Sequence, residues 1–224
     1  DFLKKLRQTA VDINKELAKK LKIPQSTAIT CVKPSGTVSQ LVDSASGIHT
    51  RHSPYYIRTV RCDTKDPLTS FMIDQGFPNE PDVTNPNSVT VFSFPIKSPD
   101  RAVCRKNVGA IQQLETWLMY QKHWCEHKPS VTISVKDHEW MDVGAWVYNN
   151  FDHIAGISFL PYADHVYKQA PYQDCDEEQY KELLKTMPTN VDFSAFKEDQ
   201  DNTTGSQELA CTGGVCELVD VSAN

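Results

Sequence analysis

Two kinds of apolar pattern alternate along this chain, and their alternation limits the folds that it can adopt. Short apolar runs predict strands, and they lie at residues 27–32, 55–61, 88–94, 131–135 and 154–160. Apolar residues at helical spacing predict helices at 2–22, 67–74, 108–127, 139–151 and 177–187, with a short helix through Leu41 and Val42. Strands that alternate with helices usually pair in parallel, so the sequence predicts an α/β architecture with a parallel sheet.

Local signals mark where some of these segments end. Pro24 ends the first helix, whereas Asp66 is a natural N-cap and Pro67 suits the first helical position. Beyond Lys197 the run from 198 to 208 is polar and acidic, which is the composition of a disordered linker. We therefore expect a folded domain at 1–197 and a flexible tail at 198–224.

Composition excludes several classes of protein. The chain has 224 residues and a net charge of −6, which gives no support to nucleic-acid binding. Its apolar runs are too short for a transmembrane helix, and the charged start at residues 1–5 is not a signal peptide. Seven cysteines without a repeating spacing favour the reducing cytoplasm over a secreted disulfide framework. The chain begins without methionine inside an expected helix, which suggests a piece of a longer protein.

The turn at 34–39 joins an expected strand to an expected helix. Backbone N–H groups at the start of a helix lack intrahelical partners and attract anions. Gly36 lets the backbone approach a ligand closely, and Ser35, Thr37 and Ser39 add hydroxyl donors. The segment therefore suits a phosphate group, although it is not a P-loop. A simple helix cap at Ser35 explains the same residues and remains an alternative.

Cys211 and Cys216 lie in the polar tail, where burial in a core does not explain them. Gly213 and Gly214 between them permit a tight loop, so the two sulfur atoms can reach disulfide geometry. A dithiol on a flexible segment suggests a redox shuttle. An incidental disulfide, half of a zinc site and two unrelated thiols remain alternatives, because C-x-x-C is the usual redox spacing. Cys175 and His165 are too isolated to complete a zinc site, so no metal site is expected.

Residues 33–41 and 44–49 resemble the substrate-phosphate loop of ribonucleotide reductase catalytic chains, and residues 208–216 resemble their C-terminal cysteine pair. Between them, residues 131–135, 146–148 and 156–162 fall in the order of the late barrel strands and helices of that family. The resemblance implies the C-terminal portion of the ten-stranded α/β barrel of ribonucleotide reductases, followed by a flexible tail.

Within this family the chain looks closest to the adenosylcobalamin-dependent branch, in particular to the type that reduces ribonucleoside triphosphates. The iron-dependent branch uses two adjacent tyrosines late in the barrel, and the comparable stretch at 165–172 has no such pair. Tyr55 and Tyr56 are adjacent, but they follow the phosphate loop too closely. The resemblance therefore implies adenosylcobalamin as cofactor. A metal-dependent ribonucleoside-diphosphate reductase large chain is the alternative.

The resemblance also implies roles for individual residues. Thiyl-radical chemistry converts the ribonucleotide substrate to a 2′-deoxyribonucleotide, while Cys211 and Cys216 re-reduce the active-site disulfide and are reset by thioredoxin. The residues expected to bind the substrate phosphates are Ser35, Gly36, Thr37, Val38 and Ser39. The radical cysteine lies upstream of the phosphate loop in this family, so we expect the chain to be inactive without the upstream remainder of the reductase chain. A non-enzymatic dithiol redox or phosphate-binding module is the alternative from a different class.

The remaining candidates have structural interpretations. His49, Arg51 and His52 are expected in a charged, solvated loop rather than in a ligand cluster. The four tryptophans are expected to be core residues on helices, at positions 117, 124, 140 and 146. The other cysteines lie in segments that the family does not use for chemistry and are expected to be structural thiols: Cys31, Cys62, Cys104, Cys125 and Cys175.

Overall fold

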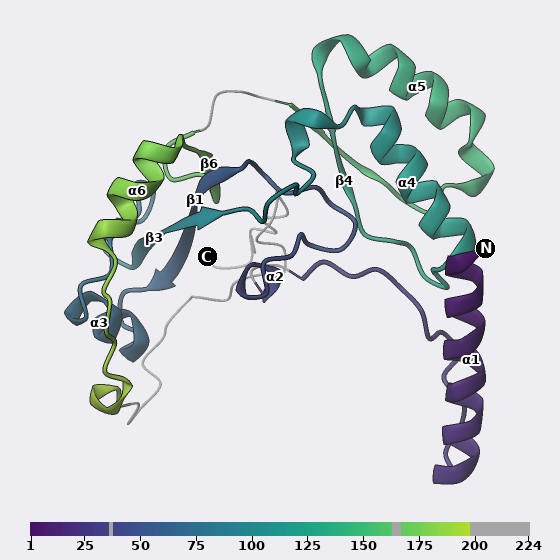
Figure 1. The fold of residues 1–224 in the computed structure, drawn as a ribbon, viewed down its shortest axis with the longest axis horizontal. Helices are drawn as coiled ribbons and strands as arrows, with labels where there is room; N and C mark the ends of the chain where they lie inside the picture. The colour runs from purple at the N-terminus through teal and green to yellow at the C-terminus, as the bar shows by residue number, and fades with distance from the viewer. Residues whose placement is uncertain (36–37, 163–166, 198–224) are drawn as a thin grey trace, which may run out of the picture. The chain divides into compact units, whose positions relative to one another are not determined.

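The polypeptide is divided between two compact units, and each unit draws on two separate stretches of sequence (Figure 1). The structure is a computed structural model and describes residues 1–35, 38–162 and 167–197. The first unit contains the described residues of Asp1–Arg51 and Val103–Ala163, and the second contains those of His52–Ala102 and Asp164–Asn224. The domain boundary near Lys197 stays a prediction.

The first unit combines helices with a pair of parallel strands. Its main elements are α1 (Phe2–Leu21), α2 (Val38–Leu41), α4 (Ala110–His123), β4 (Thr132–Val135), α5 (Trp140–Asn149) and β5 (Ser158–Pro161). Short 3-10 helices lie at Arg105–Asn107, Asp137–Glu139 and Phe151–His153. β4 and β5 run parallel, with Thr132 opposite Ser158 and Val135 opposite Pro161.

The core of the first unit lies between β4 and the helices α4 and α5. Successive strand residues point to opposite faces, so Ile133 and Val135 are fully buried. Trp117 and Trp146 bring indole rings into this core, and their N–H groups donate to Pro129 O at 3.0 Å and to Glu115 Oε1 at 2.6 Å. Both tryptophans are therefore core residues, as the sequence predicted. The buried cluster consists of Ala110, Leu114, Trp117, Leu118, Val131, Ile133, Val135, Val143 and Trp146.

Helix α1 spans the first expected helix and ends where the sequence predicts. Lys22 adopts the left-handed conformation with φ 57°, and its N–H donates to the carbonyls of Ala18 and Lys19, which is a common way for a helix to end. α1 packs on α4 within the first unit. Across the part of the chain that the structure describes, no helix is long and apolar enough to cross a membrane.

The second unit is built on a four-stranded sheet in the order β2-β3-β1-β6. Its elements are β1 (Tyr55–Asp63), α3 (Pro67–Asp74), β2 (Asn79–Pro81), β3 (Val89–Lys97), β6 (Tyr172–Asp174), α6 (Glu177–Thr186) and a 3-10 helix at Phe193–Ala195. Each neighbouring pair of strands is antiparallel. α6 packs against β3 and β1, and Figure 1 shows it beside these strands.

The expectation of parallel strands is wrong for the four-stranded sheet of the second unit. A helix between two strands usually returns the chain for a parallel pairing, but the helix α3 is followed by the short strand β2, which the sequence did not reveal. The turn after β2 then makes β3 its antiparallel neighbour, and β3 pairs with β1 from Tyr55 opposite Lys97 to Asp63 opposite Val89. Parallel pairing is confined to β4 and β5 among the described strands.

The segment 27–32 is not a strand, contrary to the sequence-based expectation. Its backbone groups bond to the loop that follows α4 instead of to a neighbouring strand. The carbonyl of Thr30 accepts the N–H of Glu126 at 2.8 Å, and the carbonyl of Val32 accepts the N–H of Ser130 at 3.1 Å. An apolar run with buried positions therefore satisfies its polar backbone without entering a sheet.

Candidate functional site

The segment leading into the expected phosphate loop is held in the first unit by one carboxylate. Glu126 Oε2 accepts the N–H groups of Ile29 at 2.6 Å and Thr30 at 3.0 Å. These two bonds, first that from Ile29, lower the pKa of the Glu126 carboxyl group. Arg7 on α1 approaches the other carboxylate oxygen at 3.5 Å. Glu126 thus fixes the chain a few residues before Ser35, a role that the sequence analysis missed.

Two further contacts hold the same segment. The hydroxyl of Thr30 donates to Trp124 O at 2.5 Å, and the indole N–H of Trp124 donates to Cys31 O at 3.1 Å. Trp124 ends helix α4 and is partly buried, so its packing agrees with the expected core role. Trp140 is exposed instead, because it opens helix α5 at the edge of the core, so the core assignment of Trp140 was wrong.

The loop itself is described at Ser35, Val38 and Ser39, whereas Gly36 and Thr37 lie outside the described residues. The Ser35 N–H donates to Ser46 Oγ at 2.9 Å, and the Ser35 carbonyl accepts the Val38 N–H at 3.1 Å. The hydroxyl Oγ of Ser35 is buried and has no hydrogen-bond partner among the residues that the structure describes. Ser35 therefore lies just before α2. Its backbone N–H and carbonyl are hydrogen-bonded within the chain, whereas its hydroxyl lacks a partner among the described residues.

Val38 and Ser39 begin helix α2, and their side chains differ in solvent exposure. Val38 is 66% exposed, whereas Ser39 is buried. The Ser39 carbonyl accepts the N–H groups of Val42 at 3.3 Å and Ser44 at 3.0 Å, which turns the chain back toward residues 44–49. The short helix expected through Leu41 and Val42 is thus present as α2, and it ends at Leu41.

The stretch 44–51 is packed and bonded, so the expectation of a charged, solvated loop is wrong. Arg51 is only 4% exposed, and one of its guanidinium nitrogens donates to Ser44 O at 2.6 Å. His49 is partly buried, with both ring nitrogens in hydrogen bonds, to Ser46 O and to the Thr132 N–H. The sequence showed charged residues side by side but not their distant partners.

His52 belongs to the second unit and makes different contacts. Its Nε2 lies 3.1 Å from Asp174 Oδ1, and its ring stacks on Tyr172 with centroids 5.3 Å apart. The guanidinium of Arg58 lies 4.5 Å from the centre of the Tyr172 ring. These contacts join the start of β1 to β6, so His52 has a packing role within its own unit.

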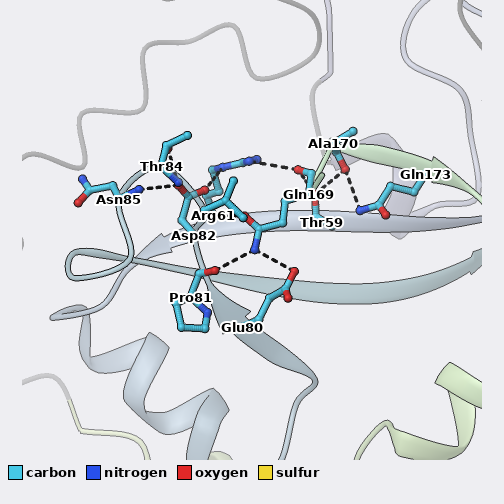
Figure 2. Close-up of polar contacts among 11 residues, drawn as sticks. Thr59, Arg61, Glu80, Pro81, Asp82, Thr84, Asn85, Gln169, Ala170 and Gln173 are labelled. Carbon is cyan, nitrogen blue, oxygen red and sulfur yellow. Dashed lines mark hydrogen bonds and ion pairs between the residues drawn. The ribbon is translucent and has the colours of Figure 1, made fainter. Parts of the chain in front are cut away.

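A polar network in the second unit surrounds Asp82 (Figure 2). The Asp82 carboxylate accepts hydrogen bonds from Arg61 Nε at 2.8 Å, from the hydroxyl and N–H of Thr84, and from the Asn85 N–H. Burial by itself raises the pKa of Asp82, but these bonds outweigh it and lower the pKa to about 2. Asp82 is therefore a charged anchor at the turn between β2 and β3.

Gln169 connects this turn to the segment before β6, as Figure 2 shows. Its side-chain amide donates to Glu80 Oε1 and Pro81 O, both at 2.8 Å, and its Oε1 accepts the Val83 N–H at 2.9 Å. Its carbonyl accepts from Arg61 at 3.1 Å. Gln169 has φ 60°, a strained conformation that these bonds stabilise. The sequence gave no signal for this network.

The described cysteines are packed side chains. Cys104 and Cys125 are buried, and Cys31, Cys62 and Cys175 are partly buried. Burial raises the pKa of the Cys125 and Cys175 thiols, which lowers their thiolate fraction at neutral pH. This environment suits the structural role expected for them. Cys211 and Cys216 lie outside the described residues.

The described residues do not include a group of three or more histidine, cysteine and acidic side chains that could bind a metal ion.

No family model matches the chain. Comparison with individual proteins is informative, however. The chain is 30% identical over 219 residues to the adenosylcobalamin-dependent ribonucleoside-triphosphate reductase of Lactobacillus gasseri, covering 95% of this chain and 29% of that protein. For the enzyme of the same name from Euglena gracilis the identity is 28%, over 90% of this chain and 28% of that protein.

A solved structure agrees with these sequence comparisons. The crystal structure of a B12-dependent (class II) ribonucleotide reductase matches with a TM-score of 0.72 and 28% identity, over 85% of this chain and 27% of that one. Over most of its length this chain is therefore similar to class II ribonucleotide reductases. The resemblance expected from the sequence is thereby confirmed. The chain spans less than a third of the length of the class II reductases that it matches.

Proposed function

We propose that this chain is the phosphate-loop and redox-tail portion of an adenosylcobalamin-dependent ribonucleoside-triphosphate reductase. The observation that carries the proposal is the match to a class II reductase structure over 85% of the chain. In this proposal β4 and β5 with their helices form the last part of the ten-stranded barrel, residues 198–224 form the flexible tail, and the enzyme works in the cytoplasm. The upstream remainder of the reductase supplies the radical cysteine, so the chain alone does not turn over.

The proposed substrate site is the loop at 34–39, with Ser35, Gly36, Thr37, Val38 and Ser39 binding the phosphates. The unsatisfied hydroxyl of Ser35 supports this assignment, because a buried polar group without a partner costs free energy that a ligand can recover. The Ser35 N–H is already bonded to Ser46 Oγ. The loop therefore offers this hydroxyl, rather than that backbone N–H, to the phosphates.

The tail cysteines carry reducing equivalents in this proposal. A thiolate of Cys211 or Cys216 attacks one sulfur of the active-site disulfide, and the partner thiol resolves the mixed disulfide. The active-site disulfide gains two electrons and two protons, and the tail is left as a disulfide that thioredoxin reduces. Adenosylcobalamin, when bound, supplies the radical that starts ribonucleotide reduction. No described residue is assigned to cobalamin.

The test uses the complete reductase that contains this chain. Anaerobic reduction of ribonucleoside triphosphates and diphosphates is measured with thioredoxin, with and without adenosylcobalamin. We expect cobalamin-dependent reduction of triphosphates. Activity that needs no cobalamin, or that is restricted to diphosphates, would favour the metal-dependent branch. No reduction with either cofactor system would favour a non-enzymatic redox or phosphate-binding module.

The tail is tested in the same assay. Cys211→Ser and Cys216→Ser should each abolish turnover supported by thioredoxin while activity with a small dithiol survives. Cys175→Ser is the matched control, because Cys175 is partly buried next to β6 and should leave both activities intact. Equal loss with thioredoxin and with the small dithiol would contradict a shuttle role.

A further inference from the structure

A chain of three hydrogen bonds joins the start of the phosphate loop to strand β4. The Ser35 N–H donates to Ser46 Oγ at 2.9 Å. The carbonyl of Ser46 lies 2.6 Å from His49 Nδ1. At the other side of the ring, His49 Nε2 lies 2.9 Å from the N–H of Thr132, the first residue of β4. One imidazole therefore stands between the sheet and the residue that sets the position of Ser35.

The partners of His49 allow only one form of the ring. The Thr132 N–H can only donate, so Nε2 must be the unprotonated acceptor. The Ser46 carbonyl can only accept, so Nδ1 must carry the hydrogen. The two bonds coexist only in the neutral imidazole with its hydrogen on Nδ1. In the opposite tautomer, the Nε2–H would face the Thr132 N–H, and the lone pair of Nδ1 would face the carbonyl oxygen of Ser46.

His49 occupies a position at the edge of β4 where a further strand would otherwise pair. The Ser158 N–H of β5 donates to Val131 O on one side of β4, and consecutive residues of a strand direct their N–H groups to alternate sides. The Thr132 N–H therefore points to the other side, where the imidazole accepts it. Farther along this edge, Gln113 Oε1 accepts the Ser134 N–H at 3.3 Å. The edge of β4 is thus closed by side chains at both positions.

The backbone around His49 is fixed by packing on both sides. Ile48 packs against the buried cluster of the first unit. Gly47 has φ 57°, and a Cβ atom there would lie 2.9 Å from Val32 Cγ1. Arg51 bonds to the carbonyl of Ser44 and exchanges backbone bonds with Val103 and Arg105. The ring therefore has little freedom, and its bond to Ser46 transmits the position of β4 to the loop.

We propose that His49 is a positioning residue for the phosphate loop, which it sets through Ser46 from the rigid edge of β4. This inference rests on the proposed function of residues 34–39. His49 does not touch the reacting atoms in this scheme. Its removal should therefore weaken binding of the substrate phosphates while turnover at saturating nucleotide is nearly unchanged.

The first experiment measures steady-state kinetics in the complete reductase, with inorganic tripolyphosphate as a competitive probe of the phosphate site. For His49→Ala we expect the KM for nucleotide and the Ki for tripolyphosphate to rise together by about fivefold, the size of one lost hydrogen bond, with kcat within about twofold. His153→Ala is the control, because His153 is exposed in the same unit. An unchanged Ki in His49→Ala would overturn the inference.

Two conservative variants separate the two contacts of the ring. Asparagine at position 49 can place its amide nitrogen near the site of Nδ1 and keep the bond to Ser46. Glutamine can place an oxygen near the site of Nε2 and keep the bond to Thr132. Because the two contacts act in series between β4 and Ser46, we expect both variants to raise the Ki for tripolyphosphate nearly as much as His49→Ala. A Ki within about twofold of wild type in either variant would show that the connection from β4 through the ring is not needed, and would overturn the inference.

A double-mutant cycle that combines His49→Ala with Ser46→Ala gives a second test of this connection. Ser46→Ala removes the acceptor of the Ser35 N–H and should raise the Ki by a similar factor. Because both residues act through one connection, the double variant should show no larger effect than either single one. Fully multiplicative effects would overturn the inference.

Failure of the proposed function would give a different result. Tripolyphosphate would then not compete with nucleotide in the wild-type enzyme, and Ser35→Ala or Thr37→Ala would leave the KM for nucleotide unchanged.

Discussion

The Nε atom of Arg61 lies 2.8 Å from Oδ2 of Asp82, and this carboxylate is only 2% exposed. Arg61 is on β1, and Asp82 follows β2 directly, so the pair ties an inner strand of the sheet to the turn before β3. Arg61 also donates to the carbonyl of Gln169 at 3.1 Å. One guanidinium therefore holds three separate parts of the second unit together.

Asp82→Asn should destabilise the chain. The substitution removes the charge that balances Arg61 and replaces one acceptor oxygen by a donor nitrogen in a buried site. Loss of one partner from a buried ion pair costs about 3–5 kcal/mol, and because the Arg61 side chain is 35% exposed we expect about 2–3 kcal/mol. Urea unfolding measures the change. Asp74→Asn, at an exposed position in α3, is the control and should be neutral.

Acid should remove the stabilisation that the ionised Asp82 carboxylate gives to the wild-type chain. Hydrogen bonds hold the pKa of Asp82 at about 2, below its usual value of 3.8. A lowered carboxyl pKa stabilises the fold above the unfolded-state value, and this stability is lost as the pH falls from about 4 to about 2. We expect the free energy of unfolding to fall by about 2 kcal/mol over this window. Asp82→Asn should show a shallower slope there, and an unchanged slope would contradict this assignment.

Gln169→Ala should open the turn between β2 and β3. The substitution leaves the Val83 N–H without the amide oxygen that accepts it at 2.9 Å, and it places alanine at φ 60°. We expect a loss of about 2–3 kcal/mol. Hydrogen exchange resolved to single residues should show the Val83 amide exchanging faster, while Ile133 in the first unit is unaffected. Equal acceleration at both amides would indicate global unfolding instead.

Glu126→Gln should loosen the segment that leads to the proposed phosphate loop. The carboxylate accepts the Ile29 and Thr30 N–H groups, and a neutral amide accepts such bonds less strongly. We expect faster hydrogen exchange at these two amides. Because the pKa of Glu126 is lowered, the wild-type protection should be present above the ordinary value of 4.5 and decline as the pH falls below it. Glu178→Gln, at an exposed position in α6, is the control and should leave the exchange of both amides unchanged.

The sequence predicted those features whose causes are local. Helix α3 runs from Pro67 to Asp74 with Asp66 as its N-cap, as expected, because the cap accepts an N–H only two residues away. The strand expected at 27–32 failed because its backbone bonds to Glu126, 96 residues from Thr30. The periodicity of apolar residues reports burial, but it does not report which chain segment supplies the hydrogen-bond partners.

The candidate site also contains residues that local sequence signals identify and residues that depend on distant contacts. Ser35 and Ser39 could be selected from the strand–turn–helix pattern and from the family resemblance. His49 was misjudged, since Thr132, which completes its contacts, lies 83 residues away. The positive φ of Gln169 and the burial of Asp82 also depend on tertiary contacts. An analysis based on residue spacing in the sequence therefore does not identify residues whose contacts lie far away along the chain.

Two glycines give a matched test of the backbone beneath the site. Gly47 has φ 57°, and an added Cβ would meet Val32 Cγ1 at 2.9 Å, whereas Gly144 lies within helix α5 with nothing inside 4 Å. Gly47→Ala should cost about 1–3 kcal/mol of stability and should raise the Ki for tripolyphosphate, because His49 lies two residues later. Gly144→Ala should instead stabilise the chain by about 0.5–1 kcal/mol, since alanine favours the helix. Thermal unfolding and inhibition of the complete reductase check both variants. Equal effects of the two substitutions would show that the conformation at Gly47 is not needed for the loop.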